Sequence, residues 1–244
     1  METRVESRAL WGRIGAIALP LGIVILVAAT AVHPSREDVM NHTAVFREYA
    51  QTDAWIAVHF TQWLASLVLF GGLVALYFAM APKREGSAVL ARFGLAAVVL
   101  TTAAITMLQA VDGVALKWAV DAWADAPADQ ESSAFAAAMG LRWTEYALQS
   151  YSNILLGLTL IFFGLAIAYG TAYSRWLGWL ATASGVAWII HGLMVSYVGL
   201  FDSVPRLVAL VLMAIWAFAL AVQMWPGRRS RAARTAAPAG PVTA

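Results

Sequence analysis

The feature that most constrains this chain is a succession of six apolar segments, each long enough to cross a lipid bilayer as a helix. An α-helix rises about 1.5 Å per residue, so about 20 apolar residues match a hydrocarbon core about 30 Å thick. The segments occupy residues 14–32, 54–81, 90–110, 134–173, 176–200 and 206–225. Hydrophobic residues make up 61% of the chain and charged residues only 12%, whereas soluble domains are about 25% charged. We therefore predict an all-α membrane protein with six transmembrane helices in one bundle.

The third and fourth spans are longer than a bilayer requires. The helical pattern of the third span continues to about Ala124. The fourth helix is predicted to begin near Ala134, with Ser132 or Ser133 as its N-terminal cap, and to run to about Tyr173. We expect these two helices to project together as a hairpin on the outer side of the membrane.

The basic residues predict the orientation of the bundle, because cytoplasmic loops carry an excess of Lys and Arg. Eleven of the 16 basic residues fall on the side of the two termini, which is therefore predicted to be cytoplasmic. Residues 1–13 form a cytoplasmic segment, 14–225 the membrane domain, and 226–244 a basic tail that we expect to be disordered. The eleven are Arg4, Arg8, Arg13, Lys83, Arg84, Arg92, Arg175, Arg228, Arg229, Arg231 and Arg234.

The amino-acid composition indicates the kind of organism that the protein comes from and the classes of partner that it can have. The chain contains no cysteine, which excludes disulfides, thiolate metal sites and a cysteine nucleophile. Its basic residues are almost all arginine, a bias typical of GC-rich bacterial genomes, so we predict a multi-pass protein of a bacterial cytoplasmic membrane. The lipid bilayer is the predicted partner. No nucleic-acid partner is expected, since the positive charge is the ordinary topology signal.

Polar residues recur on four of the spans, all in the predicted outer half. Arg142, Glu145, Gln149 and Asn153 are spaced so that they share one face of the fourth helix. A helix that enters lipid must turn such a face inward, since unpaired polar groups in hydrocarbon are costly. The other spans contribute His59, Gln62, Gln109, Asp112 and His191. The nine residues together predict an outward-facing polar pocket inside the bundle.

The pattern leaves several interpretations of this pocket open. The polar residues could form a structural core in which side chains satisfy one another between helices. They could instead line a pocket for a small amphiphilic ligand, whose aromatic walls Tyr146, Tyr151, Trp63, Trp188 and Tyr197 would supply.

Cofactor sites are a further class of interpretation. His59, Asp112, Glu145 and His191 are residue types that bind zinc, iron or manganese. His59 and His191 lie on different spans and could ligate a b-type haem from its two faces. Neither set contains a short motif such as H-E-x-x-H, so both sites depend wholly on the fold. A proton- or ion-coupled transporter is disfavoured, because the inner half lacks ionisable residues.

Residues outside the spans are predicted to face water or the headgroups. The loop histidines His33 and His42 are interpreted as solvated. The segment Ala44–Tyr49 is predicted to form a short interfacial helix with Phe46 and Tyr49 at the headgroups. Trp55, Trp118 and Trp123 are interpreted as interfacial anchors, and Lys117 is placed beside them.

Several short motifs resemble those of a family of uncharacterised bacterial six-helix integral membrane proteins, a domain of unknown function. The first span ends in His33-Pro34, and the loop reads Phe-x-Glu-Tyr-Ala from Phe46 to Ala50. An Asp-x-Trp-x-x-x-His motif formed by Asp53, Trp55 and His59 then opens the second span. The resemblance covers most of residues 14–225 and implies a six-span fold in a membrane. It implies no activity.

Taken together, these observations favour a non-enzymatic membrane protein with an outward-facing polar pocket for a small amphiphile. The alternative is a metal- or haem-dependent membrane enzyme that uses His59, Asp112, Glu145 and His191. The two hypotheses make different predictions, because His59→Ala should release a bound metal, whereas an amphiphile that fills a pocket should raise thermal stability.

Overall fold

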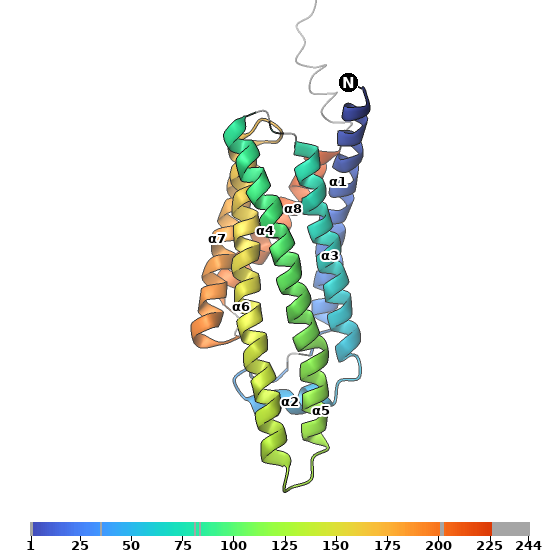
Figure 1. Cartoon of the computed structure of the whole chain (residues 1–244), viewed down its shortest axis with the longest axis vertical. Helices are drawn as coiled ribbons and strands as arrows, with labels where there is room; N and C mark the ends of the chain where they lie inside the picture. The colour runs from blue at the N-terminus through green and yellow to red at the C-terminus, as the bar shows by residue number, and fades with distance from the viewer. Residues whose placement is uncertain (1, 35, 81, 83, 201–202, 226–244) are drawn as a thin grey trace, which may run out of the picture.

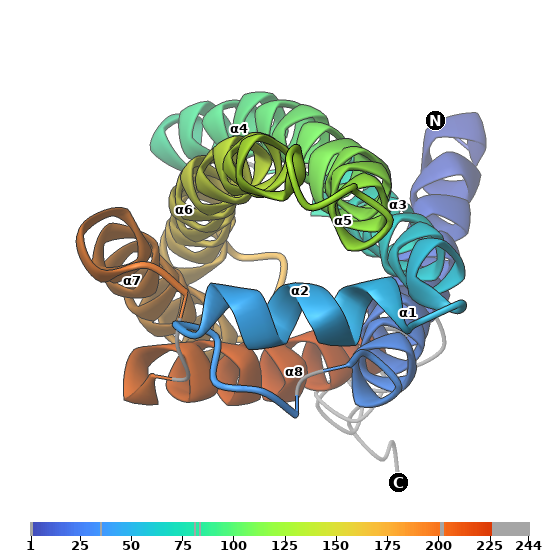
Figure 2. The ribbon, with the colours of Figure 1, turned by 90° about the horizontal axis from the view of Figure 1, so that it is seen from below.

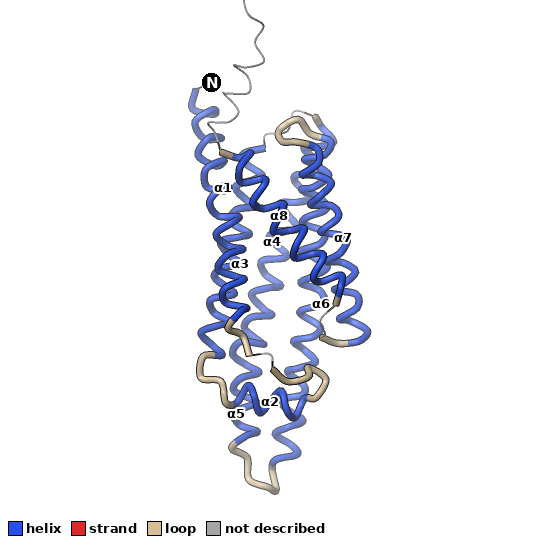
Figure 3. Tube along the Cα trace, turned by 180° about the vertical axis from the view of Figure 1, so that it is seen from behind, coloured by secondary structure: helices blue, strands red, loops and turns tan. Residues whose placement is uncertain are grey.

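The computed structural model describes residues 2–34, 36–80, 82, 84–200 and 203–225, and every regular element among these residues is helical (Figure 1, Figure 3). The predicted all-α fold is thus confirmed. The helices in chain order are α1 (Glu2–Ala31), α2 (His42–Ala50), α3 (Trp55–Met80), α4 (Glu85–Ala110), the π-helix η1 (Val111–Leu116), α5 (Lys117–Ala124), α6 (Glu131–Tyr169), α7 (Arg175–Val198) and α8 (Val204–Met224).

Six of these helical stretches are long and apolar enough to cross a membrane, as predicted. Helices α4, η1 and α5 run on without a break as one stretch of 40 residues, Glu85–Ala124, and α6 has 39 residues. Each would rise about 60 Å, twice the thickness of a hydrocarbon core. Figure 1 shows the result, a hairpin of α5 and the start of α6 that extends beyond the other helices.

The two ends of the described chain lie at one end of the bundle. The methionine that ends α8, Met224, lies against the first half of α1, where a Cβ added at Gly12 would be 2.7 Å from its carbonyl oxygen. We call the opposite end, which holds α2, α5 and the turn between α7 and α8, the distal end. Seen from that end, α2 lies across the bundle (Figure 2).

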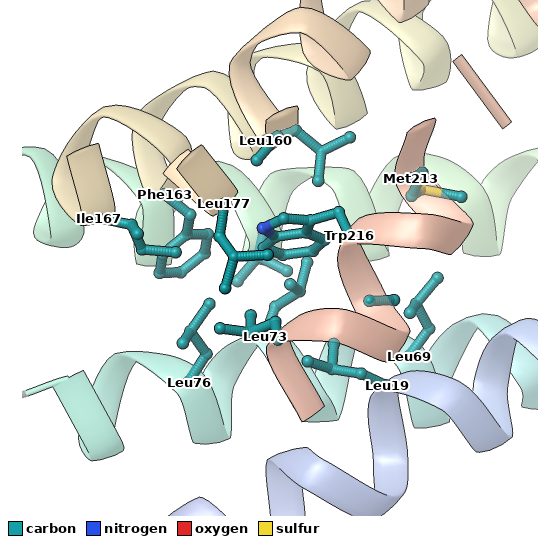
Figure 4. Packing of buried hydrophobic residues seen from close by; sticks show 14 of the residues in the cluster. Leu19, Leu69, Leu73, Leu76, Leu160, Phe163, Ile167, Leu177, Met213 and Trp216 are labelled. Carbon is teal, nitrogen blue, oxygen red and sulfur yellow. The ribbon is translucent and has the colours of Figure 1, made fainter. Parts of the chain in front are cut away.

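The core is apolar and continuous through the bundle. Trp216 of α8 is almost fully buried and lies among side chains from α3, α6 and α7, including Leu73, Leu160 and Leu177 (Figure 4). Within a bilayer, large side chains of this kind hold helices together through van der Waals packing. The six spans therefore share one core, to which α8 contributes Trp216.

Glycines allow α6 and α7 to approach closely. A Cβ at Gly157 of α6 would lie 2.5 Å from the carbonyl oxygen of Gly185 on α7, and the reverse distance is also 2.5 Å. About two turns further along the same interface, Gly164 of α6 and Gly178 of α7 make the same kind of contact. Small residues at such positions let the backbones of membrane helices pack against each other without side chains between them.

Most predicted helix ends are correct to within a few residues, but α1 begins at Glu2, well before the predicted start of the first span at residue 14, and one predicted cap is wrong. Helix α6 begins at Glu131 rather than near residue 134, and its N-cap residue Gln130 makes no side-chain cap hydrogen bond. Ser133 is instead inside the helix, and its hydroxyl donates to the Gln130 carbonyl. Helix α8 has a side-chain cap, because the Ser203 Oγ accepts a hydrogen bond from the Arg206 backbone N–H.

The short helix α2 forms as predicted, but its apolar face is turned into the protein. Val45, Phe46 and Tyr49 are buried against α5 and the start of α6 rather than placed at the headgroups. Trp55 is fully buried beneath α2, and Trp123 is buried as well, so neither is an interfacial anchor. These predictions were wrong because α5 and α6 extend far enough to give α2 a protein surface to cover. The predicted tail, 226–244, lies outside the described residues.

Candidate functional site: a buried polar cluster beside a distal groove

A group of titratable side chains lies beneath α2 at the distal end. We call these six residues the polar cluster; they come from the segment after α1, from α2, α3, η1 and α6. They are His33, Tyr49, His59, Asp112, Arg142 and Glu145. Four of them were predicted as site residues from the spacing of polar groups on the spans, and His33 and Tyr49 were not.

His59 and Asp112 form the first pair in the cluster. The His59 Nε2 lies 3.1 Å from the Asp112 Oδ2, and the His59 Nδ1 lies 2.9 Å from the carbonyl oxygen of Trp55. The Trp55 indole Nε1 donates to the Asp112 backbone carbonyl at 3.0 Å. These bonds tie the start of α3 to η1 and fix the imidazole at both ring nitrogens.

The π-helix η1 places Asp112 in this position. Its six residues widen the helix by one residue per turn, a change that is frequent at functional sites. Gly113 is required there, since a Cβ at that residue would lie 2.5 Å from the Cβ of His59. The missing side chain lets α3 approach until the imidazole reaches the Asp112 carboxylate.

Arg142 and Glu145 form the second pair, on α6. The Arg142 Nη1 donates to the Glu145 Oε2 at 2.7 Å and to the Tyr49 hydroxyl at 3.1 Å. The guanidinium also lies 4.8 Å from the ring centroid of Tyr146, a favourable cation–π distance. Both charged side chains are almost fully buried, so each depends on the other for compensation of its charge.

His33 and Tyr49 face both pairs and link them electrostatically. Burial lowers the pKa of His33, and the nearby His59 lowers it further, while Asp112 acts in the opposite direction. Burial raises the pKa of the Tyr49 hydroxyl; Arg142 opposes this shift, and Glu145 and Asp112 add to it. At neutral pH both groups are therefore uncharged.

The remaining predicted site residues lie outside the polar cluster, on α3, α4, α6 and α7. The Gln62 Nε2 donates to Thr30 of α1 at 3.2 Å, and the Gln149 Nε2 donates to the Asn153 Oδ1 at 2.9 Å. The Gln109 Oε1 is buried with no hydrogen-bond partner among the described residues. The ring of His191 lies on α7, with its Nδ1 3.0 Å from the Ser203 Oγ.

The four predicted metal ligands are thus divided among three places. His59 and Asp112 are together, Glu145 is bonded to Arg142, and His191 lies beside Ser203. Within the described part of the chain, no group of three or more His, Asp or Glu is placed to hold a metal ion. Both ring nitrogens of His59 already have partners, so this imidazole has no free lone pair for a haem iron.

A groove opens at the distal end between α6 and the last turns of α7. It encloses about 530 Å³, within the range of small-molecule sites. Aromatic and apolar side chains line most of it, and Ser196 and Gly199 contribute the polar and backbone surface. The lining residues are Met40, Trp143, Tyr146, Ala147, Tyr151, Val195, Ser196, Tyr197, Val198 and Gly199.

Tyr146 joins the groove to the polar cluster. One side of its ring lines the groove, and the Arg142 guanidinium lies 4.8 Å from the ring centroid. Of the five aromatic residues expected as pocket walls, Tyr146, Tyr151 and Tyr197 line this groove. Trp63 lies elsewhere, where its indole donates to Thr106, and Trp188 is buried in the core.

The two loop histidines that were interpreted as solvated are partly or largely covered by protein, and His33 belongs to the polar cluster. His33 was interpreted as solvated, yet its ring lies 4.9 Å from that of His59 and 5.0 Å from that of Trp55. His42 is half-buried and lies 5.3 Å from the ring of Trp143, and burial and Arg142 lower its pKa. The available signal was the grouping of His33, Tyr49 and Trp55 in one short loop region ahead of His59.

Comparison of the chain with protein-family models, with curated proteins and with solved structures finds no match. The conclusions on function therefore depend on the geometry of the groove and the polar cluster.

Proposed function

We propose that this protein is a multi-pass binding protein of a bacterial cytoplasmic membrane that holds a small amphiphile in the distal groove. Both termini are placed in the cytoplasm on the basis of the basic residues at their end of the bundle. The distal end then faces outward, and the groove opens where the bundle meets the outer headgroups.

The observation that carries the proposal is the make-up of the groove. Its described lining contains four aromatic side chains and no histidine, carboxylate, lysine or arginine. Tyr197 is 89% exposed and Tyr151 67% exposed, which leaves large aromatic surfaces available to a ligand. Tyrosine and tryptophan combine an apolar ring with a polar tip, a combination suited to a ligand at a membrane–water boundary.

The lining of the groove supports a ligand with an apolar chain and a polar head. An apolar chain fits along Tyr146, Val195 and Val198, while the head lies at the end of α7. The last carbonyl groups of a helix lack partners within the helix, so they accept hydrogen bonds from hydroxyl or ammonium groups. A single-chain lipid with such a head group matches both parts. The lining offers no acid, base or nucleophile other than hydroxyl groups, which is why the proposal is binding and not catalysis.

The test is to fill the groove without altering the core. Ala147 is exposed and lines the groove, so Ala147→Trp should occupy the ligand volume at little cost in stability. Ala136 is an exposed alanine on the same helix that does not line it, and Ala136→Trp is the matched control.

The measurement is native mass spectrometry of the purified protein with lysophosphatidylethanolamine as the probe. The wild-type protein and Ala136→Trp should retain bound lipid, and Ala147→Trp should lose at least tenfold in affinity, or about 1.4 kcal/mol. Equal retention by all three proteins would show that the lipid binds outside the groove. No retention by the wild-type protein would reject this ligand class.

A further inference from the structure

The hydrogen bonds of His59 require more protons than a neutral histidine supplies. Its Nδ1 lies 2.9 Å from a backbone carbonyl oxygen, that of Trp55, and its Nε2 lies 3.1 Å from a carboxylate oxygen of Asp112. A carbonyl oxygen and an ionised carboxylate oxygen only accept hydrogen bonds. A neutral imidazole carries a single N–H, so it satisfies one of these contacts and turns a lone pair toward an acceptor in the other.

One additional proton removes this conflict in either of two ways. A protonated imidazole donates from both nitrogens, to Trp55 and to Asp112. Alternatively, a protonated Asp112 donates to the Nε2 while the Nδ1–H donates to Trp55. In both cases the pair holds one proton more than a neutral histidine and an ionised aspartate, and no other atom changes its bonding.

The charges around His59 and Asp112 also favour one additional proton on this pair. His59 lies against His33 from the segment after α1 and Asp112 of η1. The Asp112 carboxylate in turn interacts electrostatically with Tyr49 of α2 and with Arg142 and Glu145 of α6. Arg142 and Glu145 form an ion pair. Burial lowers the pKa of His33, and Tyr49 is uncharged at neutral pH, as a phenol ordinarily is. Without the extra proton, Asp112 would leave one uncompensated negative charge in a buried site, which is costly.

We propose that His59 and Asp112 form a proton-binding site within the membrane domain, which is occupied at neutral pH. The proton comes from water at the distal end and allows both hydrogen bonds of His59, to Trp55 and to Asp112, to form together. Its loss turns a nitrogen lone pair toward the acceptor in one of these two contacts and weakens the site. This inference goes beyond the proposed function and does not depend on a ligand in the groove.

The test measures where the proton is. The chain has only four histidines, so ¹⁵N NMR of the full-length protein with labelled histidine can follow each imidazole, with His59→Gln to assign one signal. At about pH 8 an unperturbed histidine is almost wholly neutral. We expect His59 to remain protonated there, or else Asp112 to show a carboxylic acid band in the infrared that is lost in Asp112→Asn.

Two variants separate the site from a general effect of charge. In Asp112→Asn, the amide can donate to the Nε2, so His59 should be neutral at about pH 8 with no acid band. Asp121→Asn removes a carboxylate from α5 that pairs with Lys117, and it should leave the His59 signal unchanged.

The wild-type protein alone suffices if Asp112→Asn fails to fold. A neutral His59 together with no carboxylic acid band at about pH 8 would overturn the proposal. The same result in Asp121→Asn as in Asp112→Asn would also count against it, because the proton would then respond to charge in general.

Discussion

Arg142 carries a buried charge that is compensated by Glu145 on the same face of α6. Removing one partner of such a pair leaves an uncompensated buried charge, which typically costs about 3–5 kcal/mol. We therefore expect Glu145→Gln to lower the free energy of unfolding by about that amount. Thermal unfolding of the purified protein in mild detergent measures it.

The control replaces both charges at once. In the double variant Arg142→Met, Glu145→Leu no charge is left unpaired, so it should be more stable than Glu145→Gln even though it changes one more residue. Glu131→Gln, an exposed carboxylate at the start of the same helix, should have almost no effect. A double variant less stable than the single one would mean that the contacts of Arg142 with Tyr49 and Tyr146 matter more than its charge.

Single residues also show where the sequence was a sufficient guide. The spacing of Arg142 and Glu145 on a helix entering lipid could only be accommodated by turning both inward, and they are buried. Trp55 and Tyr49 are of the residue types that are enriched at membrane interfaces. No local pattern in the sequence distinguishes an aromatic residue at a headgroup from one buried under another helix. Their burial depends on α5 and α6, which lie more than 60 residues away in the chain.

Among the elements, α6 and α7 approach each other closely where Gly157 faces Gly185. Gly157→Ala would place a Cβ 2.5 Å from the Gly185 carbonyl oxygen and 2.6 Å from a side-chain carbon of Ile189. Overpacking of this kind costs about 1–3 kcal/mol, and we expect a corresponding fall in the melting temperature.

Gly71 supplies the control for this prediction, because it is also a glycine inside a spanning helix and a Cβ there meets nothing within 4 Å. Gly71→Ala should leave stability unchanged or raise it, since alanine favours helix by about 1 kcal/mol over glycine. If Gly157→Ala proved as stable as Gly71→Ala, the contact between α6 and α7 would have to be looser than it is in the structure.

The helices themselves follow from hydrophobic length, which is why all six spans were predicted. The predicted start of the first span, at residue 14, was too late because α1 continues back through the polar residues before it. The π-helix η1 was not predicted. Its sequence, from Val111 to Leu116, has no signal of its own, and its geometry is matched to the imidazole that lies against Gly113. An element stabilised by a partner on another helix has no pattern within its own residues.

For the whole molecule, the orientation in the membrane is the prediction to test. The absence of cysteine makes the chain suitable for single-cysteine labelling. Asp129→Cys lies in the exposed turn between α5 and α6, and Arg8→Cys lies exposed near the N-terminus. With a membrane-impermeant maleimide, we expect Asp129→Cys to react in intact cells and Arg8→Cys to react only after permeabilisation. The opposite pattern would place the polar cluster on the cytoplasmic side.

The covering position of α2 has a consequence for the order of assembly during synthesis. Helix α2 leaves the ribosome between the first two spans, but its apolar face packs on Leu116 and Val120 of the third span and on Ala138 at the start of the fourth. Until those residues have been made, Phe46 has no protein surface to bury against. The early chain must therefore hold its first two spans in the membrane with the site still open, and the cluster is sealed from water only after the fourth span has entered.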